Sequence, residues 1–193
     1  MPVKLKRSFF EKPTLAVARK LLGMQLVTMV GGKITSGTIV EVEAYHQRGD
    51  RASHSYRGPT PRSAIMFGVA GHCYVYFIYG AHFCVNIVTE KAGTGAAILI
   101  RALEPLRGVA TMKRRRHTSQ LKSLTNGPGK LCQALGINRN MLGEDLLHSK
   151  RIWIESGLAE SRKQIGTSIR IGISKSKRLP WRFFLKNSPY LSR

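Results

Sequence analysis

Two acidic residues, Glu41 and Glu43, stand two positions apart in residues 36–45, a stretch in which apolar and polar side chains alternate. A strand here would put both carboxylates on one face, with Cα atoms about 6.5–7 Å apart, and Tyr45 would continue that face. One interpretation is a solvated sheet face, or a pair of partners for lysine and arginine. The other is a carboxylate that activates a water molecule for attack on a sugar. The spacing alone leaves both open.

A second stretch is rich in tyrosine: Tyr74, Tyr76 and Tyr79 come close together, and Gly80 follows. A buried phenol needs a hydrogen-bond partner, so three of them are a costly way to fill a core. Packing within a hairpin is one interpretation of this stretch. The other is an exposed aromatic at a hairpin tip that stacks on bases or enters a nucleic-acid duplex.

The remaining polar candidates are isolated. His54 lies among serines and, taken alone, indicates a hydrogen-bonded loop histidine. Residues 127–130, Gly-Pro-Gly-Lys, lack the spacing of a phosphate-binding P-loop and predict a turn that leads into a helix, with Lys130 free to meet a phosphate. The histidines and cysteines show no metal-ligand spacing. We therefore expect neither a metal nor a cofactor.

The composition is strongly basic, with 32 Lys and Arg against 10 Asp and Glu and a net charge of +22 over 193 residues. Such a surface attracts polyanions, namely DNA, RNA or anionic lipid. Residues 63–89 carry no charged side chain and are long enough to span a membrane, but their aromatic and β-branched pattern predicts two buried strands. Three cysteines and the lack of a leader-like apolar stretch in residues 1–10 favour a cytoplasmic protein without membrane association.

The pattern along the chain predicts one mixed α/β domain over residues 1–193. The basic residues 1–8 are expected to be flexible, and residues 117–126 to form a mobile loop. Helices are predicted at residues 14–22, 106–116 and 129–135. Strands are predicted at residues 25–30, 36–45, 73–79, 82–89, 96–102, 152–155, 169–173 and 181–185.

Many short motifs occur in an order typical of one family. They are Ile39-Val-Glu-Val-Glu-Ala-Tyr45, Ala52-Ser-His-Ser55, Thr60-Pro-Arg62, Tyr74-Val-Tyr-Phe-Ile-Tyr-Gly80, Cys84-Val-Asn86, Leu99-Ile-Arg-Ala-Leu-Glu-Pro105, Gly127-Pro-Gly-Lys-Leu-Cys-Gln-Ala-Leu135, Ile171-Gly-Ile173 and Pro180-Trp-Arg-Phe183. In this order they resemble the alkyladenine (3-methyladenine) DNA glycosylases, over nearly the whole chain. The resemblance implies a curved, mainly antiparallel sheet flanked by short helices. It also implies a monofunctional enzyme that flips a damaged purine out of duplex DNA and hydrolyses its bond to the sugar.

The resemblance also implies roles for individual residues. Glu43 matches the catalytic general base of the family, and Arg101 matches the arginine that helps to hold the attacking water. Tyr45, His54 and Tyr76 match the groups that stack on the flipped base or bond to it.

Asn86 matches the pocket asparagine that hinders entry of normal guanine, and Tyr79 matches the side chain inserted into the gap left in the duplex. Glu41 has no counterpart with an assigned role. The chain departs from many relatives at Ser63, where Asn is common, and at Ala81, where Met is common. Both positions lie near the predicted loop and wedge, so they bear on substrate preference.

A two-residue turn through Gly80 and Ala81 would put Tyr76 and Asn86 on opposite faces of the hairpin. If both line one pocket, the turn must be longer or bulged. The expected partner is double-stranded DNA with damaged purines, bound by a monomer in the bacterial cytoplasm or, in a eukaryote, the nucleus. The alternative from charge and aromatic content alone is a non-catalytic RNA- or ribosome-binding protein.

Overall fold

A computed structural model describes residues 3–78, 80–157 and 164–192. The strands are β1 (Gln25–Val30), β2 (Lys33–His46), β3 (Cys73–Ile78), β4 (His82–Val88), β5 (Ala96–Arg107), β6 (Ile152–Glu155), β7 (Ile165–Ser168) and β8 (Arg182–Leu185). The helices are α1 (Arg7–Phe10), α2 (Thr14–Leu21), α3 (Val109–Arg116) and α4 (Pro128–Leu135), with 3-10 turns η1 (Ala64–Phe67), η2 (Leu121–Ser123) and η3 (Arg139–Met141). The mixed α/β fold class predicted from the sequence is confirmed.

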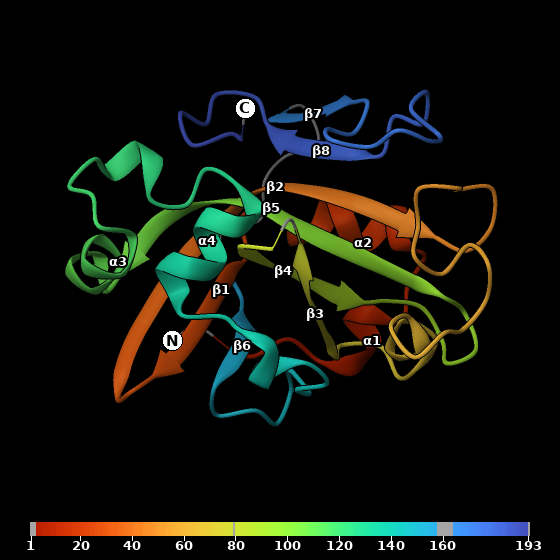
Figure 1. Ribbon diagram of the computed structural model, residues 1–193, viewed down its shortest axis with the longest axis horizontal. Helices are drawn as coiled ribbons and strands as arrows, with labels where there is room; N and C mark the ends of the chain where they lie inside the picture. Colours follow the sequence, from red (N-terminus) through yellow and green to blue (C-terminus); the bar gives the residue numbers. More distant parts are fainter. Residues whose placement is uncertain (1–2, 79, 158–163, 193) are drawn as a thin grey trace.

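All the described strands belong to one antiparallel sheet, in which the main order is β3-β4-β5-β2-β1-β6. Its centre is the pair of long strands β2 and β5. One edge of β2 changes partner along its length: residues 33–38 pair with β1, and residues 41–43 pair with β8. β8 in turn pairs with β7, and these two strands branch from the main order beside β2; Figure 1 shows them in blue above the rest of the fold.

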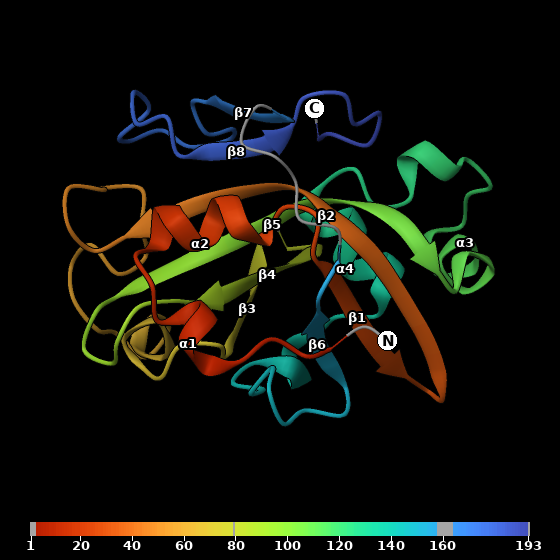
Figure 2. The same cartoon turned by 180° about the vertical axis from the view of Figure 1, so that it is seen from behind.

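Apolar faces of the helices close the core on the curved sheet. Val17, Ala18 and Leu21 of α2 are buried, as are Leu131 and Leu135 of α4. Figures 1 and 2 place these two helices on opposite sides of the β2–β5 pair. The main hydrophobic core that results includes Ile39, Val42 and Ala44 of β2, and it fixes the position of this strand, which carries the two glutamates.

Two predicted elements are wrong in part. Residues 169–173 form no strand. The strand lies just before them as β7. Arg170 donates to the Ala44 carbonyl and to the Asp50 carboxylate, and the Ile171 N–H donates to the Glu43 carboxylate, so these groups do not pair with a neighbouring strand. The helix predicted at 106–116 begins at Val109, since β5 continues to Arg107. Gly108 makes this junction with a φ of +73°, and a Cβ there would lie 2.2 Å from the Ile34 carbonyl oxygen.

Other predicted elements lie where expected, within a residue or two: α2, α4, β1 and β6, and the two strands β3 and β4 in the charge-free residues 63–89. Residues 117–126 include η2. Among the described residues, no helix is long and apolar enough to cross a membrane. Near the N-terminus, the Lys4 ammonium donates to the Ser149 carbonyl at 2.8 Å, and Arg7 pairs with Asp145 at 2.8 Å.

Candidate active site

The two glutamates of β2 are both fully buried, so the solvated-face interpretation is wrong. They share one face of the strand, as the alternation predicts, and residues 170–192 cover that face. The Ile171 backbone N–H donates to Glu43, and the Ser192 N–H donates to Glu41. This face of β2 is therefore the floor of a covered site.

Glu43 is held by three donors from three parts of the chain. The Tyr45 hydroxyl donates to its Oε2 at 2.7 Å, and the Ile171 N–H donates to its Oε1 at 2.7 Å. Arg101 Nη1 lies 3.3 Å from the same Oε1. The carboxylate of Glu43 is therefore fixed in position by two hydrogen bonds and a neighbouring guanidinium.

Arg101 is placed by an irregularity in the β2–β5 ladder. The Cα partners pass from Glu41↔Ala102 to Val42↔Ile100, so Arg101 has no direct partner on β2. A bulge of this kind turns a side chain away from the regular alternation. The guanidinium reaches both carboxylates, with Nε 3.1 Å from Glu41 Oε1 and Nη1 beside Glu43.

A cavity of about 700 Å³ opens beside these residues. Tyr45, Arg101 and Ile171 form part of its wall, and each of them contacts Glu43 directly. Glu43 lies immediately behind that wall. The other lining residues that bear on the argument are His54, Tyr74, Tyr76, Asn86, Lys130 and Ser192. A cavity of this volume is large enough for a purine.

Aromatic rings form one side of the cavity. The His54 ring meets the Tyr76 ring edge to face at 4.8 Å, and its Nδ1 shares a hydrogen bond with the Tyr74 hydroxyl at 2.8 Å. Arg62 lies over the Tyr76 ring, 5.0 Å from its centre. Desolvation of the His54 ring against the tyrosines, with the charge of Arg62, lowers its pKa to about 4 although much of the residue is exposed. The imidazole is therefore neutral at pH 7.

The β3–β4 register brings the pocket residues onto one face. Tyr74 pairs with Asn86 and Tyr76 with Cys84, and three residues separate Ile78 from His82. The turn is thus one residue longer than a two-residue turn. In this register Tyr76 and Asn86 lie on the same face of the hairpin, so both can line the cavity. The Asn86 amide donates from Nδ2 to the Tyr74 carbonyl at 3.1 Å. Tyr79, the predicted wedge, lies outside the described residues.

Tyr45 faces the cavity and is fixed from behind. The Arg170 guanidinium lies 4.5 Å from the centre of its ring. Burial, followed by the neighbouring Glu43 carboxylate, raises the pKa of the phenol, so Tyr45 remains a neutral donor. Arg170 itself is buried and makes a two-point pair with Asp50, with both N···O distances 2.6 Å.

Sequence reasoning missed three of these contributors: Tyr74 as a partner of His54, and the Arg170–Asp50 pair behind Tyr45. The phenol-rich stretch was a signal for Tyr74. No local signal exists for the ion pair, because 120 residues separate its members.

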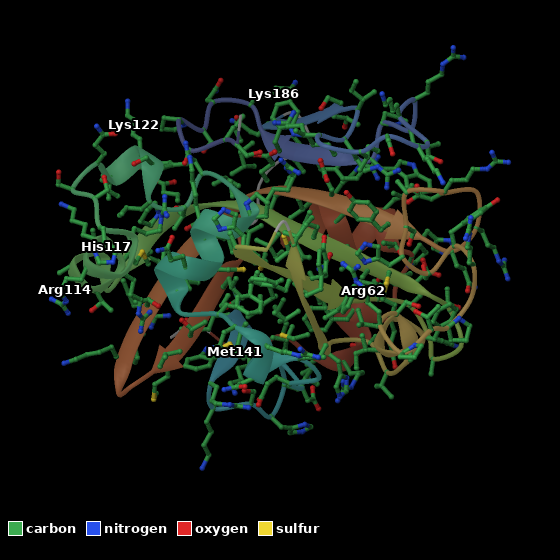
Figure 3. All side chains as sticks on the ribbon, in the orientation of Figure 1. Arg62, Arg114, His117, Lys122, Met141 and Lys186 are labelled. Atoms are coloured by element: carbon green, nitrogen blue, oxygen red, sulfur yellow. The ribbon has the colours of Figure 1, made fainter. Side chains whose placement is uncertain are left out.

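Basic side chains surround the site, but some are structural. Lys130 is exposed at the cavity, and its ammonium donates to Asn126 Oδ1 at 2.9 Å. In the basic helix α3, Arg115 donates to the Ala134 carbonyl near the end of α4. Figure 3 shows Arg114, His117 and Lys122 together at the left edge of the molecule, and all three are exposed.

Within residues 3–78, 80–157 and 164–192, no group of three or more His, Cys, Asp or Glu side chains is arranged to hold a metal ion. The three cysteines are all buried, and none forms a disulfide.

The site thus combines a buried carboxylate paired with an arginine and a neighbouring cavity with aromatic walls, in a strongly basic protein. Comparison with known proteins identifies the class. The family described as methylpurine-DNA glycosylase (MPG) matches residues 8–189, and the chain belongs to this family.

Relatives support the same assignment. The chain is 49% identical over 192 residues to a protein of Methanoculleus marisnigri, covering 98% of each. It is 48% identical over 190 residues to one of Bradyrhizobium diazoefficiens and 46% identical over 190 residues to one of Chlorobaculum parvum, covering 98% of this chain and 90% of each relative. All three are named "Putative 3-methyladenine DNA glycosylase". The protein is a DNA-binding hydrolase of N-glycosyl bonds that acts in base excision repair, not the RNA-binding alternative.

Proposed function

We propose that the cavity receives a damaged purine rotated out of duplex DNA, and that Glu43 activates the water that replaces it on the sugar. The observation that carries this proposal is the position of Glu43. Its buried carboxylate lies directly behind the cavity wall, held by Tyr45, Ile171 and Arg101.

The contacts of Glu43 suit a general base. Its Oε1 contacts both the Ile171 N–H and Arg101, whereas among the described residues its Oε2 accepts only from Tyr45. Oε2 therefore keeps a lone pair for a water molecule. In the proposed step this water attacks C1′ of the sugar and gives its proton to Glu43. The glycosidic bond breaks, and the base leaves with the bonding electron pair. Arg101 holds the water from the other side.

The cavity wall favours an alkylated purine. A base such as 3-methyladenine leaves the sugar readily because it is cationic before cleavage, so one carboxylate suffices. The aromatic faces of Tyr45 and Tyr76 attract a cation by about 0.5–2 kcal/mol per contact. The neutral His54 imidazole adds no opposing charge on that side of the cavity.

Asn86 supplies selection against normal guanine. It is nearly fully buried, and its bond to the Tyr74 carbonyl fixes the amide in the cavity wall. A fixed amide cannot move aside for the exocyclic amino group of guanine, so this base is excluded. Damaged pairs are also cheaper to unstack, which adds selectivity at the flipping step.

The DNA partner is bound through its phosphates. The net charge of +22 attracts duplex DNA without reading its sequence, and the exposed Lys130 is the proposed phosphate contact at the cavity mouth. Tyr79 is proposed to fill the gap left by the flipped base. We further propose that the protein acts as a monomer, with the DNA in the cytoplasm of a bacterial cell or the nucleus of a eukaryotic one.

The proposed function is tested by incubating the protein with methylated duplex DNA and separating the released bases by chromatography. We expect free 3-methyladenine, an intact strand with an abasic site, and the same rate with and without a chelator. Release of no base, or activity that a chelator abolishes and zinc restores, would contradict the proposal.

A further inference from the structure

The second glutamate, Glu41, accepts four hydrogen bonds, and their donors come from three separate parts of the chain. Its Oε1 accepts from Arg101 Nε at 3.1 Å, Arg182 Nε at 2.7 Å and the Ser192 hydroxyl at 2.7 Å. Its Oε2 accepts from the Ser192 N–H at 2.6 Å. The carboxylate thus joins β5, β8 and the end of the chain at one buried point.

Different nitrogen atoms of Arg101 contact different partners. Its Nε donates to Glu41 Oε1 and to the Ser192 hydroxyl, both at 3.1 Å. Its Nη1 faces Glu43 and also lies 3.5 Å from the Ile171 carbonyl. Glu41 and Ser192 therefore hold one edge of the guanidinium and leave the Nη1 end for the site.

This division matters because a guanidinium and a single carboxylate tend to form two parallel hydrogen bonds. Such a pair between Arg101 and Glu43 would occupy Oε2 of Glu43, the oxygen that is proposed to accept the proton of the attacking water. Glu41 competes for Arg101 through Nε, and Arg182 balances the charge of this second carboxylate. Two carboxylates and two arginines share the floor of the site, so neither carboxylate is buried without a charged partner.

On these contacts, and resting on the proposed function, we propose that Glu41 and Ser192 are positioning residues for the hydrolytic step. They fix Arg101 in the orientation that contacts Glu43 through one nitrogen only, and so keep the second oxygen of Glu43 available to water. Ser192, which is 151 positions from Glu41 in the sequence, thereby contributes to the chemistry from the cavity wall.

The test is a double-mutant cycle in the full-length protein. Glu41→Gln keeps the shape of the side chain and removes the charge that holds Arg101. We expect single-turnover base release to slow by at least about 10-fold, within the range seen when general-base catalysis is impaired, with unchanged affinity for lesion DNA. In an Arg101→Gln background, where there is no guanidinium to position, Glu41→Gln should cost no further rate.

Glu155→Gln is the matched control. Glu155 also pairs with an arginine of β5, Arg107, at 2.7 Å, but lies on β6 away from the cavity. We expect it to alter the melting temperature without changing base release. Ser192→Ala is the milder second variant, since it removes the hydroxyl bonds to Glu41 and Arg101 and keeps the N–H. We expect base release to be about 3- to 10-fold slower, as the loss of one or two hydrogen bonds predicts, while the protein stays folded.

The outcomes separate this proposal from the proposed function. If the wild type releases no methylated base, the proposed function fails. If the wild type is active and Glu41→Gln slows release equally with and without Arg101, Glu41 is structural and the positioning role is wrong. Wild-type rates in both Glu41→Gln and Ser192→Ala would also overturn it. Should Glu41→Gln fail to fold, Ser192→Ala with and without Arg101 decides the question alone.

Discussion

The buried pair between Arg170 and Asp50 is expected to hold residues 169–173 in place, and Arg170→Met tests this. Both side chains are fully buried, and the two contacts are 2.6 Å long. Methionine keeps most of the volume but leaves the Asp50 carboxylate with only backbone donors from Ala52 and His46. Removing one partner of a buried pair typically costs about 3–5 kcal/mol of unfolding free energy.

For a chain of this length, 1 kcal/mol corresponds to roughly 2–4 °C in melting temperature, so Arg170→Met should lower it by roughly 6–20 °C. Denaturant unfolding gives the free energy directly. Arg107→Met is the control, because Arg107 pairs with Glu155 at a half-exposed position and should cost at most about 1 kcal/mol. Arg170→Met should also slow base release, since Arg170 precedes Ile171, whose N–H holds Glu43. If Arg170→Met is no more destabilised than Arg107→Met, the reasoning about this pair is wrong.

Three further predictions concern DNA binding, pH and selectivity. A plot of log affinity for undamaged duplex DNA against log salt concentration should fall with a slope of about −0.9 per phosphate neutralised. Lys130→Ala should make this slope shallower by about 1, whereas Lys20→Ala, on α2, should leave it unchanged. Equal slopes for both variants in filter-binding titrations would contradict a phosphate contact by Lys130. Because the pKa of His54 falls from 6.5 to about 4 on folding, the unfolded chain takes up a proton that the folded one does not, and stability should decline as the pH falls from about 6.5 toward 4. Urea unfolding of His54→Gln over that range should show a shallower decline, and an unchanged one would refute the assignment. Asn86→Ala should increase release of normal guanine from undamaged DNA, measured by chromatography of free bases, and guanine release at the wild-type level would argue against an excluding role.

The elements that the sequence predicted best are those whose signals are local. Alternation placed Glu41, Glu43 and Tyr45 on one strand face, and Gly136 ended α4 at the predicted residue, with a φ of +73°. The same alternation could not show that the face is covered, because the covering residues lie more than 120 positions further along the chain.

The errors have the same physical origin. Residues 169–173 read as a strand because they alternate, but their polar groups bind to Glu43, Asp50 and the Ala44 carbonyl. The bulge that turns Arg101 toward both glutamates depends on the register between β2 and β5, which no local pattern sets. The position of Arg101 in the site could be expected only from the family resemblance, whereas its two-sided contacts required the structure.

The central claim is that Glu43 activates the water, and single-turnover base release by Glu43→Gln tests it most directly. Glutamine keeps the shape of the side chain and removes the base, so the rate should fall by about 10²–10⁴ while binding to lesion DNA is kept or strengthened. Affinity for the same DNA, measured beside the rate, separates chemistry from binding. A Glu43→Gln enzyme that releases 3-methyladenine at nearly the wild-type rate would contradict the account.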